Sequence, residues 1–369
     1  MFYHGIRQLR EAYLVICKMY FDTLSQLEKE KLDSYKKVVV WGFPLHTHTH
    51  SYIHAMWVKV FKDGFGKDTY WFHNNNFPTD FDYNHCIFIT EGYADENIPI
   101  VNTSVYFVHN AICPEKYIRS GCRLIEIRFN VNEIHDINND FKLDDGTHNL
   151  IALSPHSKYE KLTSNKDIHA SRRGGVVTPM NYECIYLYWG TDLLPHEFKY
   201  DDVNIHRENV VYYIGSGVNS VNYSKFKTIC EKNNIRWVTS DPWQSPRSFE
   251  LNKILMQKSI LAPDFRPIGT SDDVKKFGIK NGKNHLEIGY LPCRVLKAIS
   301  YGQLGITDSP YVKDILQEHV VYSSNMDELF MTSMKERDNK EMITKAMKYV
   351  QENHTYLNRA TELIRALCM

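Results

Sequence analysis

Apolar residues recur in short runs along the first half of the chain, and polar turns separate the runs. Such runs predict buried β-strands, at residues 37–42, 68–72, 86–90, 104–108, 124–127 and 185–188. Residues 51–62, between the first two runs, have apolar positions at helical spacing and predict a helix. Strand, loop, helix and strand in this order are typical of a βαβ unit, so the pattern favours a parallel sheet.

A second series of the same kind begins near residue 209. It predicts strands at 209–214, 235–239, 259–263 and 302–307, with helices at 221–233, 249–258 and 295–301. A long helix is predicted over 337–367, and an amphipathic helix, in one piece or two, over 6–35. Residues 130–182 are rich in Asn, Asp and Ser and predict loops and short elements.

The two series indicate two α/β domains. A chain of 369 residues exceeds the size at which one hydrophobic core stops growing. Residues 190–208 have the composition of a linker. We therefore expect an N-terminal domain over 1–200, a C-terminal domain over 201–345, and a final helix over 346–369 that crosses back to the first domain.

Charge and cysteine usage narrow the function classes. The chain has 44 Lys and Arg against 44 Asp and Glu, whereas a nucleic-acid-binding protein needs a basic excess. The eight cysteines form no C-x-x-C pair, which argues against a zinc ribbon or a thioredoxin motif and fits a reducing compartment. No apolar run approaches the ~20 residues of a membrane span, and no signal peptide is evident. We expect a cytoplasmic protein, in the host cytoplasm if the source is a virus.

The loop after the first predicted strand carries three histidines, His46, His48 and His50, and His54 follows on the next helix. Ligands of open α/β sheets lie beyond the carboxyl ends of the strands, where this loop begins. An imidazole there can take a proton near neutral pH or bind a sugar or phosphate oxygen. Two other interpretations stay open. The three histidines could bind the metal ion of a hydrolase, or they could cap the helix and bond to backbone.

Two further candidates end neighbouring predicted strands. Glu91 follows the strand at 86–90, and His109 follows the strand at 104–108. Both occupy positions where a sheet presents groups to a ligand, although a loop residue bonded to backbone would look the same.

The second half contains candidates for binding a phosphate. Gly215, Ser216 and Gly217 lie between a strand and a helix, where backbone can approach a phosphate closely. Arg294 follows Pro292 at the start of a helix, and a cation at this end makes sense if an anion sits beside it. Arg294 and Lys297, one helical turn apart, could bracket a diphosphate together with Arg266.

The segment that carries these cations, GYLPCRVLKAISYGQLGITDS at 289–309, resembles the donor-site helix of GT-B glycosyltransferases. The histidine loop, GFPLHTHTHSYIH at 42–54, resembles the acceptor-side loop of viral and bacterial glycosyltransferase-like proteins of the same fold. The resemblance covers about residues 38–72 and 209–312. It implies an α/β fold of two Rossmann-like domains that face each other across a cleft.

The resemblance also implies an activity, which is transfer of a sugar from a nucleoside-diphosphate sugar to a glycan, glycoprotein or other hydroxyl acceptor. No metal and no cofactor is implied. Arg294 falls where the family contacts the diphosphate, and Lys297 falls where the family commonly has a Glu that holds the ribose.

The resemblance and the positions of the residues along the chain together give the remaining candidates a role. The donor-side set is completed by Gly215, Ser216, Gly217, Arg266 and Tyr290. If the enzyme inverts, His48 or His50 is the expected base, with His46, His109 and Glu91 next. If it retains configuration, the histidines would bind donor or acceptor instead. A non-catalytic protein that binds sugar nucleotides is a further alternative.

Overall fold

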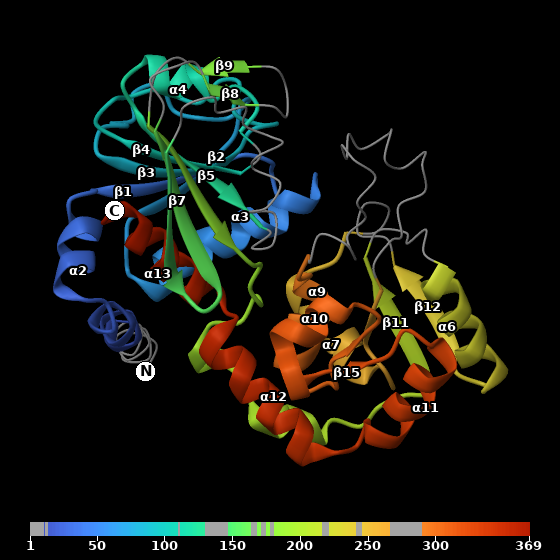
Figure 1. The fold of residues 1–369 in the computed structure, drawn as a ribbon. Coiled ribbons are helices and arrows are strands. Elements are labelled where there is room, and N and C mark those ends of the chain that lie inside the picture. The colour runs from blue at the N-terminus through green and yellow to red at the C-terminus, as the bar shows by residue number, and fades with distance from the viewer. Residues whose placement is uncertain are drawn as a thin grey trace. The chain divides into compact units, whose positions relative to one another are not determined.

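The computed structural model describes residues 11, 14–109, 111–129, 147–163, 168–170, 175–177, 181–215, 221–240, 246–265 and 290–369. The chain divides into two compact units (Figure 1). The first unit comprises residues 1–187 together with 359–369, and the second comprises residues 188–358.

A mostly parallel eight-stranded sheet forms the centre of the first unit. Its order is β2 (Thr69–Phe72), β1 (Lys37–Trp41), β3 (Cys86–Glu91), β4 (Val105–His109), β5 (Arg123–Arg128), β10 (Asn181–Leu187), β7 (Ser157–Thr163) and β6 (Thr147–Ser154). The strands from β2 to β10 run parallel, and β7 and β6 add an antiparallel hairpin at one edge. Every residue of β3 is buried, which explains why this strand is a continuous apolar run in the sequence.

Helices flank this sheet. Residues 14–22 are helical, and the other helices are α2 (Gln26–Asp33), α3 (Thr49–Lys59), its π-helical continuation η1 (Val60–Gly64), α4 (Glu115–Arg119) and α13 (Tyr356–Leu367). Helix α3 packs on β1, β2 and β3, where it buries Trp57. A short hairpin of β8 (Ile168–Ala170) and β9 (Gly175–Val177) lies outside the main sheet.

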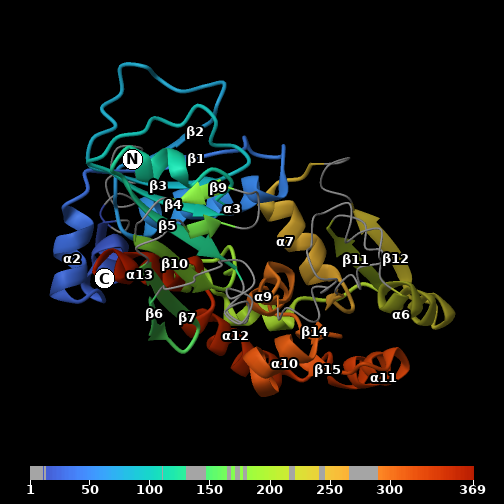
Figure 2. The same ribbon diagram turned by 45° about the horizontal axis from the view of Figure 1, so that its top comes forward.

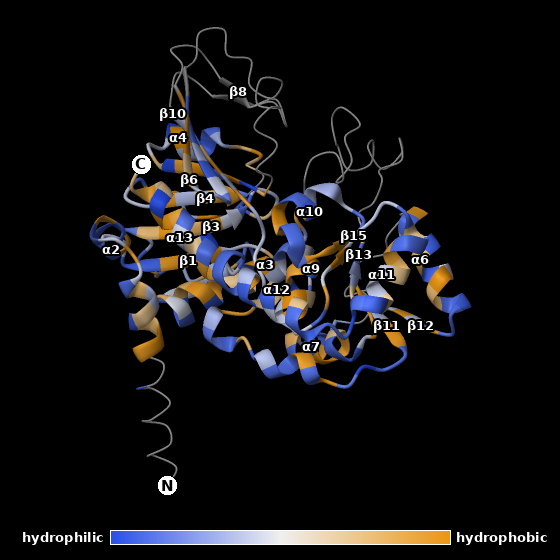
Figure 3. Ribbon diagram, turned by 60° about the horizontal axis from the view of Figure 1, so that its bottom comes forward, coloured by the Kyte–Doolittle hydropathy of each residue, from blue (hydrophilic) through white to orange (hydrophobic). Residues whose placement is uncertain are grey.

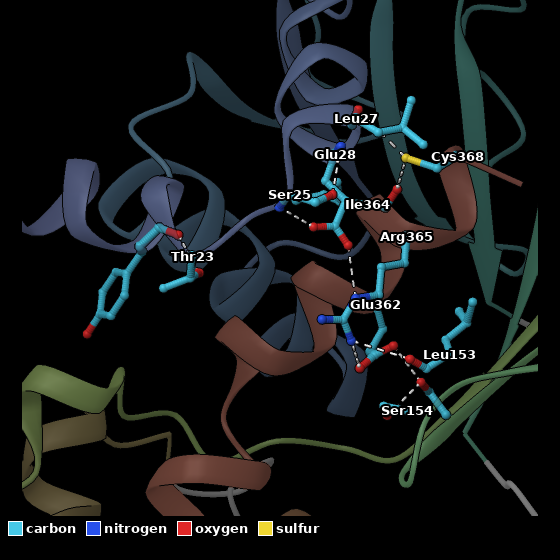
Figure 4. A network of polar contacts seen from close by, with 12 residues as sticks. Thr23, Ser25, Leu27, Glu28, Leu153, Ser154, Glu362, Ile364, Arg365 and Cys368 are labelled. Carbon is cyan, nitrogen blue, oxygen red and sulfur yellow. Dashed lines mark hydrogen bonds and ion pairs between the residues drawn. The ribbon is translucent and has the colours of Figure 1, made fainter.

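The last helix, α13, is held to the first unit by polar contacts (Figure 4). Arg365 forms an ion pair of 3.0 Å with Glu28 of α2 and a second of 3.1 Å with Glu362. Arg123 of β5 donates to the carbonyls of Leu367 and Ala366 and pairs with Glu183 at 2.8 Å. A guanidinium at the carboxyl end of a helix satisfies carbonyls that have no partner within the helix.

The second unit contains two smaller parallel sheets. Strand β11 (Val210–Ile214) pairs in parallel with β12 (Arg236–Ser240), and β13 (Pro263–Asp264), β14 (Ile306–Thr307) and β15 (Val321–Tyr322) form a second parallel set. A parallel bridge between Glu208 and Ser259 connects the two sets, so the order is β12-β11-β13-β14-β15. In both units the first strand lies between the second and the third, and the order reverses beside it, as in doubly wound sheets.

The helices of the second unit are α6 (Val221–Lys232), α7 (Phe249–Lys258), α9 (Cys293–Ser300), α10 (Pro310–Leu316), α11 (Met326–Glu336) and α12 (Lys340–Asn353). Short 3-10 turns occur at η3 (Pro195–Glu197), η4 (Tyr200–Asn204) and η5 (Gln317–His319). Figures 2 and 3 show these helices beside the parallel strands, and α6 alternates hydrophilic and hydrophobic residues along its length. The prediction of a mixed α/β fold with parallel sheets is confirmed.

Two predictions about elements were wrong. Residues 147–163 form the β6–β7 hairpin rather than loops, because one half-exposed face gives these strands alternating polar residues instead of an apolar run. The expected long helix over 337–367 is two helices. Asn339 caps the start of α12, and Thr355 exchanges hydrogen bonds with Asn358 at the start of α13.

None of the helices in the described ranges has the length and the hydropathy that crossing a lipid bilayer requires.

The anchoring of α13 predicts a stability effect. Arg123→Ala removes the two hydrogen bonds to the end of α13 and the ion pair with Glu183. We therefore expect the free energy of unfolding to fall by about 2 kcal/mol. Urea unfolding measures this change. Lys345→Ala removes an exposed ion pair with Glu341 and serves as the control, with an expected change below about 0.5 kcal/mol. Equal stability of the two variants would contradict the anchoring role.

Candidate functional site

In the first unit, three parallel strands bring polar side chains to one edge of the sheet. Strand β3 ends at Glu91 and strand β4 ends at His109, and these two residues are register partners. The loop after β1 carries His46 and His48 and leads into α3, which carries His50 and His54. Because the strand order reverses between β1 and β3, this edge is where a doubly wound sheet places its ligand.

His54 packs closely against Gly42, where the loop after β1 begins. A Cβ on Gly42 would lie 2.0 Å from the imidazole carbon Cε1 of His54, so only glycine lets this ring approach the strand end. Phe43 stacks on His48 with ring centroids 4.0 Å apart. His48 is the N-cap of α3, and its Nδ1 accepts the backbone N–H of His50.

A buried carboxylate joins two histidines at this edge, and we call His50, Glu91 and His109 the histidine–glutamate cluster. Glu91 is 1% exposed, and its Oε2 lies 2.5 Å from Nδ1 of His109 and 3.5 Å from Nε2 of His50. The two imidazole rings are 4.8 Å apart. The cluster lines a cavity of about 10 Å³ together with His54, which is room for about one water molecule or ion.

Burial keeps the nearby histidines neutral. Removal from water lowers the pKa of His50 to about 3, helped by His109 and opposed by the Glu91 carboxylate. Burial likewise lowers the pKa of His54 to about 3, and it lowers the pKa of His48. At neutral pH these rings therefore act as hydrogen-bonding groups or ligands and carry no positive charge.

The structure separates the three loop histidines. His50 lies beside Glu91 and His109, and His48 caps the helix, as the helix-cap interpretation predicts for that residue. His46 has a positive φ of 69°, and its Nδ1 lies 3.1 Å from the hydroxyl of Tyr52. Within the described residues, the group with the spacing of metal ligands is the histidine–glutamate cluster, so only His50 of the three loop histidines belongs to it.

In the second unit, Arg294 occupies the corresponding edge of the sheet. Its Nε donates to the carbonyl of Ile214 at 3.0 Å, and its Nη1 lies 3.2 Å from the fully buried carboxylate of Asp264. The guanidinium carbon lies 4.2 Å from the centre of the Tyr213 ring. These contacts hold the cation at the carboxyl ends of β11 and β13, where the strand order reverses.

Gly215 gives Arg294 its space. Its φ is +154°, a backbone conformation that favours glycine. A Cβ at this position would also lie 1.8 Å from Nη2 of Arg294. The glycine expected to let backbone approach a phosphate thus lets a cation approach backbone.

The other donor-side candidates are distributed as follows. Lys297 lies 3.3 Å from Asp192, which also accepts a hydrogen bond from Tyr301, so Lys297 and Arg294 are held by different carboxylates. Tyr290 is half-buried just before α9. Ser216, Gly217 and Arg266 lie outside the described residues.

No protein-family model matches the chain, and no curated protein is significantly similar to it. Its function must therefore be inferred from the chemistry of the two sheet edges.

The buried histidines predict how stability depends on pH. His54 binds a proton near pH 6.5 when unfolded but only near pH 3 when folded, so the unfolded state gains protons first and stability falls as pH drops below 6.5. His54→Phe removes this titratable group. The slope of the unfolding free energy against pH should therefore decrease by up to about 1.4 kcal/mol per pH unit. Urea unfolding between pH 7 and pH 4.5 measures it. A wild-type slope in His54→Phe would refute the assignment.

Proposed function

We propose that the protein is a glycosyltransferase that moves a sugar from a nucleoside-diphosphate sugar to a hydroxyl acceptor. The observation that carries the proposal is the contact of 2.5 Å between His109 and the buried Glu91, at the edge where a doubly wound unit places its ligand. The second doubly wound unit has a fixed arginine at the corresponding edge. The resemblance of residues 42–54 and 289–309 to GT-B enzymes supports the same conclusion.

The histidine–glutamate contact has the form of a general base with its orienting group. Glu91 accepts the proton on Nδ1 of His109, so Nε2 of that ring presents a lone pair. The buried carboxylate also stabilises the imidazolium that forms when Nε2 takes a proton. This favours His109 as the base over His48, whose Nδ1 is used in capping α3, and over His50, whose Nε2 faces Glu91.

The proposed reaction is a single displacement that inverts the anomeric carbon. His109 takes the proton of the acceptor hydroxyl, and that oxygen forms a bond to the anomeric carbon. The bond from this carbon to the diphosphate oxygen breaks, and its electron pair leaves with the nucleoside diphosphate. Arg294 stabilises the charge that develops on the diphosphate, since a guanidinium stays protonated and its contacts with Ile214 and Asp264 use Nε and Nη1 rather than Nη2.

Release of nucleoside diphosphate from a panel of sugar nucleotides, with glycan and simple hydroxyl acceptors, tests the proposal. His109→Asn should lower kcat by roughly 10²–10⁴-fold and leave nucleotide binding intact, because the base acts only on the acceptor. Arg294→Ala should lower kcat/KM for the donor by about 10²-fold or more.

Arg236→Ala, on the exposed side of β12, is the matched control for Arg294 and should behave as wild type. Nucleotide binding without release in every combination would favour a non-catalytic binding protein. No release and no thermal shift with any nucleotide would refute the proposal.

A further inference from the structure

The histidine–glutamate cluster also has the donor set of a transition-metal site. One ligand atom each from His50, Glu91 and His109 lies within 4.8 Å of the others. Two imidazole nitrogens and one carboxylate oxygen form a set that Zn²⁺ binds well. We propose that this cluster binds a zinc-class divalent ion, and that the bound ion prevents His109 from acting as a base. This inhibition rests on the proposed function.

The hydrogen bonds around His48 orient the first ligand. Nδ1 of His48 accepts the backbone N–H of His50, so it presents a lone pair to Nδ1 of His50, 3.2 Å away. Two lone pairs would repel at this distance, and we therefore assign the ring proton of His50 to Nδ1. The lone pair of its Nε2 then faces the Glu91 carboxylate, and a cation between the two stabilises both.

One ligand distance and the size of the cavity suit one ion. Ligand atoms about 2.0–2.2 Å from a tetrahedral zinc ion lie about 3.3–3.6 Å from one another. The 3.5 Å between Nε2 of His50 and Oε2 of Glu91 is close to this value. The 2.5 Å between Glu91 and His109 must lengthen, because a metal ion replaces the proton there. The same cavity is lined by His54, a buried ring whose Nδ1 has no hydrogen-bond partner within the described residues.

Metal binding and proton acceptance require opposite states of His109. As a base, His109 keeps its proton on Nδ1 and its lone pair on Nε2. As a ligand through Nδ1, the neutral ring carries the same proton on Nε2, so no proton is released and no lone pair is left for the acceptor. Glu91 then binds the ion instead of orienting the ring. The ion should therefore inhibit transfer without displacing the donor nucleotide.

Metal binding can be measured without any turnover. Protein stripped with a chelator is titrated with Zn²⁺ against a chromophoric competitor, and Co²⁺ reports the coordination geometry through its visible absorption. We expect one equivalent to bind, and His50→Gln and Glu91→Gln each to weaken binding at least tenfold. His46→Gln, in the same loop but outside the cluster, should bind as wild type. Absence of stoichiometric binding, or wild-type affinity in His50→Gln, would overturn the metal site.

A second measurement tests the inhibition. Zn²⁺ should abolish transfer by the wild type, a chelator should restore it, and the activity that His50→Gln retains should be at least tenfold less sensitive. Cluster-dependent binding with an unchanged transfer rate would overturn the inhibitory role. If no sugar nucleotide is turned over while cluster-dependent binding persists, the proposed glycosyl transfer fails and the metal site stands.

Discussion

Glu91 is a carboxylate almost without access to water. The candidate site depends on the groups that compensate its buried charge. A buried charge is costly unless hydrogen bonds or opposite charges compensate for it. His109 meets this need from the neighbouring strand, through its Nδ1, and His50 lies 3.5 Å away at the start of α3. The same contacts give the histidines a fixed orientation, which an exposed loop could not provide. Burial of one acid therefore organises the chemistry of this sheet edge.

The second unit applies the same constraint, and there an arginine compensates the buried acid. Asp264 is fully buried at the end of β13, and Arg294 reaches it from α9. The Tyr213 ring and the carbonyl of Ile214 hold the guanidinium from the other sides. A cation fixed in this way loses little side-chain entropy when an anion binds, which makes it suitable for a phosphate group.

Much of the fold could be predicted from the sequence, because buried parallel strands are continuous apolar runs. Strands β1, β3, β4 and β11 lie where those runs occur. The β6–β7 hairpin was not predicted, because an antiparallel edge with a half-exposed face mixes polar and apolar residues. The residues of the candidate site could be proposed singly from their positions at strand ends. Their grouping could not, because the pairing of Glu91 with His109 depends on strand order, and the departure of His46 depends on a backbone angle of the loop.

The attachment of α13 to the first unit has a consequence for folding during synthesis. Domains of a growing chain generally fold in the order in which they leave the ribosome. Here the N-terminal sheet lacks one of its covering helices until residues 359–369 emerge, after the whole second unit. Arg123 must keep its guanidinium available for carbonyls that are made 243 and 244 residues later. The first unit therefore stays without this helix until the second unit has been made, and the surface that α13 covers needs protection during that interval.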